Sequence, residues 1–596
     1  MQVSASTRRE TIRSVVPIVA LLLGLLGATR AWTGSREPQE EFARTFEKTV
    51  ALAPGQQVRL DHRLGDIVIH THAQRDVHIV ANIRVSAPSR DAAANFGNQI
   101  AIQVEQTGSA LSVRTDYPDT HKDFFRGHKS ISFSVNYDIT MPETAPLHIK
   151  NSFGNVSVVG LKAEADIENS HGLLTFRDGR GSQRLQNSFG GIELTGNAGD
   201  VSVANNNSFV RVAAVEGALS LRNRFGEVTA SNIGKQATIV NSNGNVELKQ
   251  AGGPSAVSNA FGAVNASHIS GDLVVHNSNG AVEARGIAGA AELTTSFASI
   301  SFSDIGTKLN CTASNGNISG NRVGGPAVVR NSFGAVNLSD AAGPVEIENS
   351  NGKIFVREIR GSTQLKTTFG EIDASGISGN ATASNSNGAI MLASVTGSAE
   401  VRGSFGGIEL REIRRGVRIV TGNSNVTLAD IGGETYVKTS FGLVRVDRIG
   451  GPLTVENSNG GLTASAIKGS VNARVSFSSV ILNGISGSID VDNQNGAIEV
   501  SGVTMKTAGS SSCNSITLRT SFAPIRIYLP EDAGYNVSAR TSFGQISSEL
   551  PVTVSGVTGG DSLAGKMGSG ACELRLTNSN GGIEILKARK NPKQLP

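Results

Sequence analysis

The chain has 596 residues, a formal net charge of +4 and only 17% charged residues. Its Arg and Lys residues are spread singly along the sequence rather than gathered into a basic stripe, so no nucleic-acid partner is predicted. The length exceeds what one compact core uses, whereas a repeat protein grows along one axis, each unit stacked on the last.

The first 36 residues carry the pattern of an export signal. Arg8, Arg9 and Arg13 precede an apolar run at 15–28 that ends in small residues. A basic start followed by a short apolar stretch is typical of a secretory signal, and the run is shorter than the roughly 20 residues that span a bilayer. We therefore predict an exported protein of the periplasm or cell surface, with residues 1–36 as signal and linker. An uncleaved membrane anchor is the alternative, and it would be the protein's one membrane contact.

Residues 37–150 lack the repeat described below and are predicted to form a β-rich N-terminal cap. Alternating apolar and polar residues predict strands at 57–60, 66–72, 77–85, 100–104, 110–114 and 131–140. A stacked fold needs such a cap, because its first unit would otherwise expose an unpaired strand edge and an open core.

From residue 151 onward the sequence repeats with a fixed period. Ten phenylalanines follow one another at intervals of 36 residues: Phe153, Phe189, Phe225, Phe261, Phe297, Phe333, Phe369, Phe405, Phe441 and Phe477. Midway between them the same site carries asparagine, with His171 as the exception: Asn207, Asn243, Asn279, Asn315, Asn351, Asn387, Asn423, Asn459 and Asn495. The underlying period is therefore 18 residues, with alternating N-S-F-G and N-S-N-G motifs, and a fixed period marks a stacked repeat architecture.

With Asn151 as position 1 of an 18-residue unit, the other positions also follow a rule. Position 6 is aliphatic in every unit, and positions 8, 11, 15 and 17 are mostly apolar, with polar residues between them. Alternation at 6/8 and at 15/17 predicts two strands, each with one buried face. Glycine recurs at positions 4 and 13 and marks corners, where the chain needs a positive φ or a close backbone approach.

Two strands and two corners in 18 residues leave no room for a crossover helix. We predict an all-β fold, a single-stranded parallel β-helix (β-solenoid) of twenty units over residues 151–502. At a strand spacing of roughly 4.8 Å the units make a rod about 95 Å long. A coil of 36 residues, suggested by the Phe/Asn alternation, is the alternative; it is disfavoured because the aliphatic and glycine positions repeat every 18.

Two side-chain predictions follow for the inside of the rod. Position-1 asparagines are expected to stack as an amide ladder, each donating to the same group on the next coil. Position-3 phenylalanines are expected to be buried, each filling a corner between the small asparagines above and below. An exposed stripe with about 9.6 Å between rings, usable for adhesion, is the alternative; burial is preferred because exposed rings favour aggregation.

The C-terminal part departs from the strict period. Residues 503–586 are predicted to form irregular coils, because the repeat motif returns at Thr520, Thr541 and Asn578 with altered spacing. The Gly/Ser/Val-rich segment 551–570 is predicted to be a loop, and residues 587–596 a basic tail.

The sequence offers few groups for catalysis or metal binding. Cys311, Cys513 and Cys572 lack zinc-site spacing, and unpaired buried thiols are expected, with a Cys513–Cys572 disulfide as the alternative. His70 and His72 share one strand face near His78, which permits a metal site, but no third ligand is identifiable and surface histidines are preferred.

Carboxylates are equally sparse. Asp490 and Asp492 point outward from one predicted strand, but the equivalent positions in adjacent coils are not acidic, so solvated carboxylates are expected. There is no G-x-S-x-G motif and no phosphate loop. We predict no catalytic residue, no cofactor-binding residue, no metal ligand and no cofactor.

The two ends of the repeat region resemble a known family. The segments 57–60, 65–69 and 135–142, followed by N-S-F-G-x-V-x-V, resemble the bacterial putative-adhesin family of unknown function, as do 527–530, 541–544 and 576–585. The resemblance covers most of residues 45–587 and implies an exported, right-handed parallel β-helix, with no catalytic residue.

We therefore expect a non-enzymatic, adhesin-like or scaffolding protein of the bacterial cell envelope, with a surface glycan or matrix protein as partner. An envelope polysaccharide-binding or polysaccharide-processing β-helix enzyme is the alternative. A membrane-tethered polymerising scaffold is a third hypothesis, if the N-terminal segment stays uncleaved. The sequence does not predict an oligomeric state.

Overall fold

The computed structural model describes residues 39–118, 131–505, 513–555 and 559–588. The signal or anchor predicted at 1–36 and the tail from residue 589 lie outside these ranges. Among the described residues, no helix is both long enough and apolar enough to cross a membrane.

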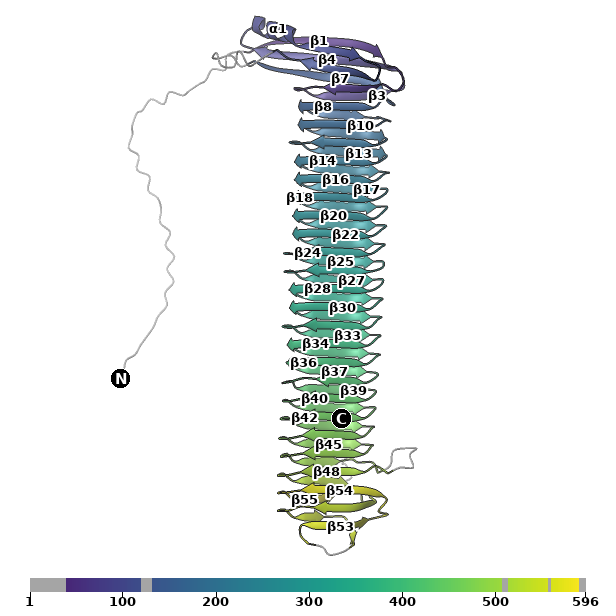
Figure 1. Cartoon of the computed structure of the whole chain (residues 1–596), viewed down its shortest axis with the longest axis vertical. Helices are drawn as coiled ribbons and strands as arrows, with labels where there is room; N and C mark the ends of the chain where they lie inside the picture. Colours follow the sequence, from purple (N-terminus) through teal and green to yellow (C-terminus); the bar gives the residue numbers. More distant parts are fainter. Residues whose placement is uncertain (1–38, 119–130, 506–512, 556–558, 589–596) are drawn as a thin grey trace, which may run out of the picture.

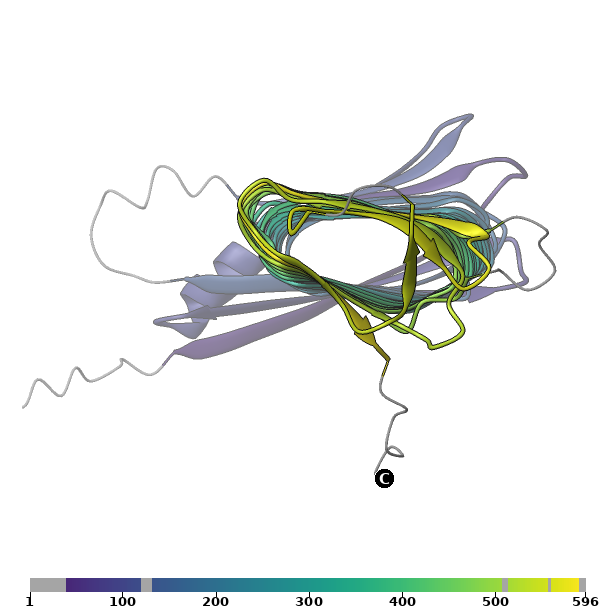
Figure 2. The same cartoon turned by 90° about the horizontal axis from the view of Figure 1, so that it is seen from below.

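The repeat region is a straight stack of coils (Figure 1), and seen along its axis the coils superimpose on a flattened oval (Figure 2). Each coil gives one strand to each of two sheets, and each strand pairs in parallel with its equivalent 18 residues on, as Ile167 does with Leu185 and Leu174 with Ile192. The predicted parallel β-solenoid of about twenty turns and about 18 residues per coil is confirmed.

Within the described residues, sheet A holds 27 strands. Along the rod its order is β1 (Glu40–Ala51), β4 (Asp76–Ala87), β7 (Ser132–Pro142), β3 (Ile67–His72), β9 (Val156–Val159), β11 (Leu174–Arg180), β13 (Ile192–Ala198), β15 (Val210–Val215), β17 (Val228–Ile233), β19 (Val246–Ala251), β21 (Val264–Ile269), β23 (Val282–Ile287), β25 (Ile300–Ile305), β27 (Ile318–Val323), β29 (Val336–Ala341), β31 (Ile354–Ile359), β33 (Ile372–Ile377), β35 (Ile390–Val395), β37 (Ile408–Ile413), β39 (Val426–Ile431), β41 (Val444–Ile449), β43 (Leu462–Ile467), β45 (Val480–Ile485), β47 (Ile498–Ser501), β49 (Ile525–Leu529), β55 (Ile583–Lys587) and β51 (Ile546–Ser548).

Sheet B holds the remaining strands. Along the rod its order is β5 (Ala101–Gln106), β6 (Ala110–Asp116), β2 (Gln57–Asp61), β8 (Leu147–Phe153), β10 (Ala165–His171), β12 (Gln183–Asn187), β14 (Val201–Asn207), β16 (Leu219–Phe225), β18 (Ala237–Asn243), β20 (Ser255–Phe261), β22 (Leu273–Asn279), β24 (Ala291–Thr295), β26 (Leu309–Ala313), β28 (Ala327–Phe333), β30 (Val345–Asn351), β32 (Thr363–Thr367), β34 (Ala381–Asn387), β36 (Ala399–Phe405), β38 (Val417–Val420), β40 (Thr435–Thr439), β42 (Leu453–Asn457), β44 (Val471–Val475), β46 (Ile489–Asn493), β48 (Ile516–Thr520), β54 (Cys572–Asn578), β50 (Tyr535–Arg540), β53 (Ser562–Met567) and β52 (Val552–Val554).

The core lies between the two sheets and is built from the positions that the sequence marks as apolar. Positions 6, 8 and 11 of sheet A and positions 15 and 17 of sheet B are buried, as Ile354, Val356, Ile359, Val345 and Ile347 show in one stretch of the rod. The burial of position 11 rather than position 10 breaks the strict alternation. The cause is a β-bulge at position 10. The parallel register pairs position 9 and then position 11 of neighbouring coils, and position 10 has no partner in it.

Position 10 has a positive φ in all twenty units, from Gly160 to Gly502, and fourteen of these residues are not glycine. The sequence did not reveal this, because the site carries Asp, Asn, Glu, Arg, His and Ala as well as Gly. Positions 4 and 13 are corners, as predicted. At position 4, Gly244 has φ +137°, and a Cβ there would lie 2.1 Å from the Gly226 carbonyl oxygen. At position 13, Gly361 is required for close approach, because its Cβ would lie 2.6 Å from the Pro344 nitrogen.

The N-terminal region caps the rod as an extension of the same two sheets (Figure 1). β2 and β3 pair in parallel with β8 and β9, so the parallel stack begins before Asn151. Beyond them the strands turn antiparallel, β4 and β1 on sheet A and β5 on sheet B, and no further coil can add there in register. The predicted strands are present. The helix α1 (Arg90–Gln99), whose N-cap Ser89 accepts a hydrogen bond from the Ala92 N–H, and the strand β1 were not predicted.

At the C-terminal end the chain doubles back. β54 lies between β48 and β50, and β55 lies between β49 and β51, so the last coil in the sequence is the last but one in the stack. The prediction of a loop at 551–570 is wrong where the segment forms two strands. Its strands β52 and β53 form an antiparallel hairpin on β50, which covers the end of sheet B.

The position-1 asparagines are buried, but the predicted amide-to-amide ladder is wrong for most of them. Asn151 donates to the Asn169 Oδ1 at 3.2 Å. In most of the later coils the amide instead donates to a backbone carbonyl of the preceding coil, as Asn457 does to the Gly442 oxygen at 2.9 Å. At two positions where threonine replaces asparagine the hydroxyl makes the same bond: Thr295 to the Gly280 oxygen at 3.0 Å and Thr367 to the Gly352 oxygen at 3.3 Å.

Replacing Asn457 with valine is expected to lower the local unfolding free energy by about 1–3 kcal/mol, because the carbonyls of Gly442 and Gly461 lose the donor that this buried amide supplies. Asn457→Thr keeps a donor in place and is expected to cost much less. Hydrogen exchange of the amides in β40 and β42 measures both, since a solenoid opens locally. Equal losses in the two variants would contradict this role for the amide.

Candidate functional surface

The ten position-3 phenylalanines lie on the outside of the rod, and their predicted burial is wrong. Together with Phe522 and Phe543 they are between 44% and 83% exposed. Strand alternation would turn position 3 inward like position 1, but the chain bends at this corner. The inner side of the corner is taken by the buried position-1 side chains, which bond to position-4 carbonyls, as Asn457 does to Gly442.

The exposed rings follow one line parallel to the rod axis. In the pairing register the phenylalanines stand beside asparagines of the neighbouring coils, as Phe225 does beside Asn207 and Asn243, and Phe405 beside Asn387 and Asn423. Neighbouring phenylalanines are therefore two coils apart, about 9.6 Å. We call this line, from Phe153 to Phe543, the Phe–Asn stripe; it is about 105 Å long at that spacing.

The stripe asparagines are fixed against the wall of the rod. In seven of them the side-chain amide donates to the backbone carbonyl of the residue that precedes the neighbouring phenylalanine, at 3.1–3.4 Å: Asn207, Asn243, Asn279, Asn315, Asn351, Asn387 and Asn580. An asparagine side chain is shorter than a phenylalanine ring, so it does not reach the outer part of the space between successive rings.

The alternation survives the change of chain order at the C-terminal end. In sequence, Phe522 and Phe543 follow each other without an asparagine between them at this site. In the stack, β54 enters between their coils and places Asn580 there, where its amide donates to the Ser521 oxygen at 3.1 Å. The Phe/Asn alternation is therefore a property of the surface and does not depend on tandem sequence order.

One position of the stripe carries a ring in place of asparagine. His171 stacks between Phe153 and Phe189, with ring centroids 4.4 and 4.7 Å apart and interplanar angles of 18° and 14°. Its Nδ1 lies 3.2 Å from the Ser152 oxygen, the contact that the asparagines make in the other coils. A flat ring thus fits between two successive phenylalanines of the stripe.

The borders of the stripe are small and almost uncharged. Among positions 2 and 4 of the twenty repeat units, which flank the ring on either side, Arg224 is the one charged residue. Most of the others are serine or glycine. Long charged side chains that could fold over the rings are thus rare immediately beside them.

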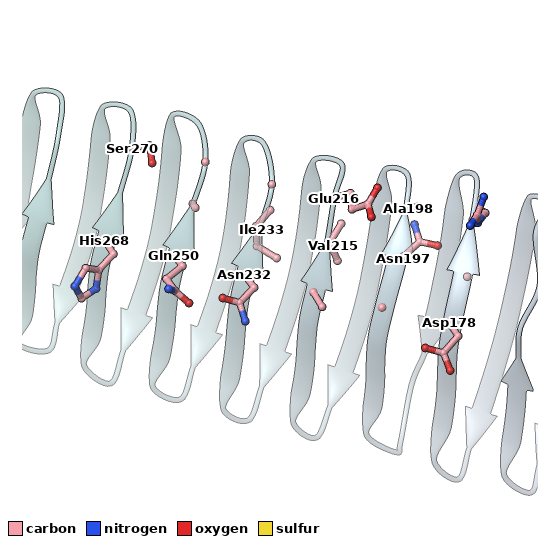
Figure 3. Close-up of a pocket in the computed structure, with 17 residues that line it drawn as sticks. Asp178, Asn197, Ala198, Val215, Glu216, Asn232, Ile233, Gln250, His268 and Ser270 are labelled. Atoms are coloured by element: carbon pink, nitrogen blue, oxygen red, sulfur yellow. The ribbon is translucent and has the colours of Figure 1, made fainter.

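A second surface feature is a shallow groove of about 840 Å³ along the position-10 bulges (Figure 3). Asp178, Asn232, Gln250 and His268 line it in one row. In contrast to the stripe, the residue type changes from coil to coil, so no single chemical contact is repeated along the groove.

Farther along the bulges, carboxylates are paired with arginines of the next coil. The Arg322 guanidinium donates two hydrogen bonds to the Asp304 carboxylate, at 2.5 and 2.8 Å. Arg448 donates two to the Asp430 carboxylate, at 2.6 and 2.8 Å. These guanidinium bonds lower the pKa of both carboxyl groups below the usual value. A general acid needs a raised pKa, so these carboxyl groups are poorly suited to that role.

The groups singled out in the sequence do not converge on a site. His70 faces Asp138 at 3.9 Å and His78 faces Glu47 at 3.5 Å, while the His72 Nδ1 accepts from the Gln74 N–H. In the described ranges no three His, Cys, Asp or Glu side chains come together as metal ligands. Asp490 bridges two coils by ion pairs to Arg474 (2.8 Å) and Arg519 (3.6 Å), and Asp492 stands next to the same two arginines in the strand register.

The expectation of unpaired thiols is wrong for two of the three cysteines. Cys513 and Cys572 form a disulfide with a Cα–Cα distance of 5.3 Å, because the returning strand β54 brings Cys572 beside the start of β48. Cys311 is a free, buried thiol, and its burial raises its pKa far above the usual value.

Comparisons with known proteins add little. No family model and no curated protein matches the chain. Among solved structures, the chain is similar to a putative cell adhesion protein from Clostridium sporogenes ATCC 15579, at 10% sequence identity and a TM-score of 0.18. The match covers 36% of this chain and 100% of that one. This chain is a β-solenoid with a distant structural likeness to a protein of that description.

Proposed function

We propose that the protein is an exported, non-enzymatic rod of the bacterial cell envelope that acts in adhesion or as a scaffold through its Phe–Asn stripe. The observation that carries the proposal is the single line of twelve exposed phenylalanines. Soluble monomers rarely expose apolar surface of this extent, and such surface commonly marks an interaction site.

Repetition on a stiff support supplies the mechanism. One exposed ring makes a weak contact, but a rigid rod holds the next ring at a fixed distance, so each further contact forms at high effective concentration. The parallel ladders and the antiparallel caps at both ends support this stiffness.

Two further observations support the proposal. The Cys513–Cys572 disulfide is typical of proteins in oxidising compartments outside the cytosol, which agrees with an exported chain. Farther along the position-10 bulges, Asp304 and Asp430 are bonded to arginines of the next coil, which makes these two carboxylates poor groups for acid–base catalysis.

The test is a binding array of surface glycans and matrix proteins probed with residues 37–596. We expect binding that falls about tenfold or more when Phe297, Phe333 and Phe369 are replaced by serine. Phe355→Ser is the matched control, because Phe355 is 40% exposed on the face of sheet A, off the stripe. Reproducible cleavage of any glycan on the array would overturn the non-enzymatic proposal.

A further inference from the structure

We infer that the partner of the Phe–Asn stripe is a second copy of this chain, whose phenylalanines enter the gaps between the phenylalanines of the first. The inference rests on the proposed function and names the partner of the same surface. Two rods would lie side by side with their stripes interleaved.

The gaps have the size of an aromatic ring. Successive phenylalanines are about 9.6 Å apart, so a ring halfway between them lies about 4.8 Å from each, within the range of stacked aromatic pairs. His171 fills one gap in this way, at 4.4 and 4.7 Å from Phe153 and Phe189. In the later gaps the asparagine lies against the wall of the rod, and because its side chain is shorter than an aromatic ring it does not reach the outer part of the gap.

A second copy of the chain necessarily has the same distance between successive phenylalanines as the first. Any difference between the period of the stripe and that of its partner accumulates over the line and breaks contact after a few gaps. Two copies share one period whether they run parallel or antiparallel, because reversing a regular row leaves its spacing unchanged. The antiparallel arrangement is a two-fold interface, in which the same surface serves both partners and closes the assembly at two rods.

The area and the charge fit this partner. With a side-chain surface of roughly 200 Å² per ring, about half exposed, twelve rings offer about 1,200 Å² on each partner, above the roughly 800 Å² of a standard interface. When two copies of one surface meet, charges of the same sign come close together and repel each other, so charged borders would disfavour the contact. The stripe avoids this, since Arg224 is the one charge at positions 2 and 4 of the repeat units.

The decisive experiment fills the gaps without removing any phenylalanine. Asn279, Asn315, Asn351 and Asn387 are replaced by histidine, which at position 171 keeps the bond to the neighbouring carbonyl and closes the gap with its own ring. Self-association of residues 37–596 is measured by sedimentation over a concentration series, for the unchanged chain and for this variant.

We expect the unchanged chain to sediment as a dimer and the gap-filled variant to dissociate about tenfold or more readily. General stickiness of the rings predicts the opposite, because the variant has more aromatic surface. Phe355→Ser is expected to leave the dimer intact. A circular dichroism spectrum and melting curve like those of the unchanged chain show that the variant still folds.

Two outcomes would overturn the inference. In the first, the unchanged chain stays monomeric at its highest soluble concentration; in the second, it dimerises equally well with the gaps filled. A monomer that binds an array glycan or phosphatidylcholine vesicles through Phe297, Phe333 and Phe369 would reject the second copy and retain the stripe as an adhesive surface. A dimer without any array binding would support the second copy and limit the proposed function to scaffolding.

Discussion

Loss of the Cys513–Cys572 disulfide is expected to lower the free energy of opening of the C-terminal coils by about 4 kcal/mol. The bond closes a loop with a sequence separation of 59 residues, and the estimate is the loop entropy that the unfolded segment regains. The last coil in the sequence, β54 and β55, lies between coils that precede it in sequence, so its release also separates β50 and β51 from the rest of the stack.

Hydrogen exchange of residues 513–588 with and without a reductant measures this opening. The Cys513→Ala/Cys572→Ala variant is the control, because the reductant should have no further effect on it. The buried Cys311 stays present in both proteins. Unchanged protection of β54 after complete reduction would show that pairing alone holds the returning coil.

The N-terminal cap is expected to loosen in acid because of one buried histidine. His62 is 3% exposed, and its Nδ1 lies 3.1 Å from the Thr115 hydroxyl and 3.3 Å from that of Tyr117. Thr115 in turn shares a 2.7 Å hydrogen bond with the Tyr137 hydroxyl. Burial lowers the pKa of His62 from 6.5 to about 4, against the opposing effect of the Val135 and Leu64 backbone.

Because the folded-state pKa lies below the unfolded one, folding requires the neutral ring. The stabilisation is complete above about pH 6.5 and is lost as the pH falls toward about 4, by about 3 kcal/mol in total. The tyrosines facing the ring do not titrate in this range, since burial raises the pKa of both Tyr117 and Tyr137.

Amide exchange in β2 and β6 between pH 7 and about 4 measures the effect, after correction for the intrinsic pH dependence of exchange. His62→Gln stays neutral and is expected to abolish the extra acid lability, whereas His148→Gln, a change at a partly exposed histidine beside Asp166, should retain it. An unchanged acid profile in the His62 variant would assign the lability to another group.

The repeat itself could be predicted from the sequence because every coil must bury the same apolar positions against its two neighbouring coils. An aliphatic residue at every position 6, from Val156 to Ile498, has only its equivalents above and below to pack against. That requirement sets the period, the parallel pairing and the identity of the core. The bulge at position 10 left no residue-type signal, since a short turn with positive φ accepts Asp304, Arg322 and Gly376 alike.

The candidate surface could not be predicted in the same way. The sequence shows the line of phenylalanines but not the side of the wall on which it lies. Strand alternation places Phe225 on the inner side with Asn223, yet Asn223 is buried and Phe225 is 44% exposed. The bend of the chain between these two residues turns the phenylalanine outward. This bend depends on how the whole coil closes and not on the type of either residue.

The amino-acid sequence by itself determined the stacked coils, their 18-residue period and their aliphatic interior, because contacts between neighbouring coils repeat with the chain. Only the tertiary structure decided that the phenylalanines face outward, that Asn580 separates Phe522 from Phe543, and that Cys513 meets Cys572. These features depend on how each corner closes and on where the chain re-enters the stack, and both are set by contacts between residues far apart in sequence.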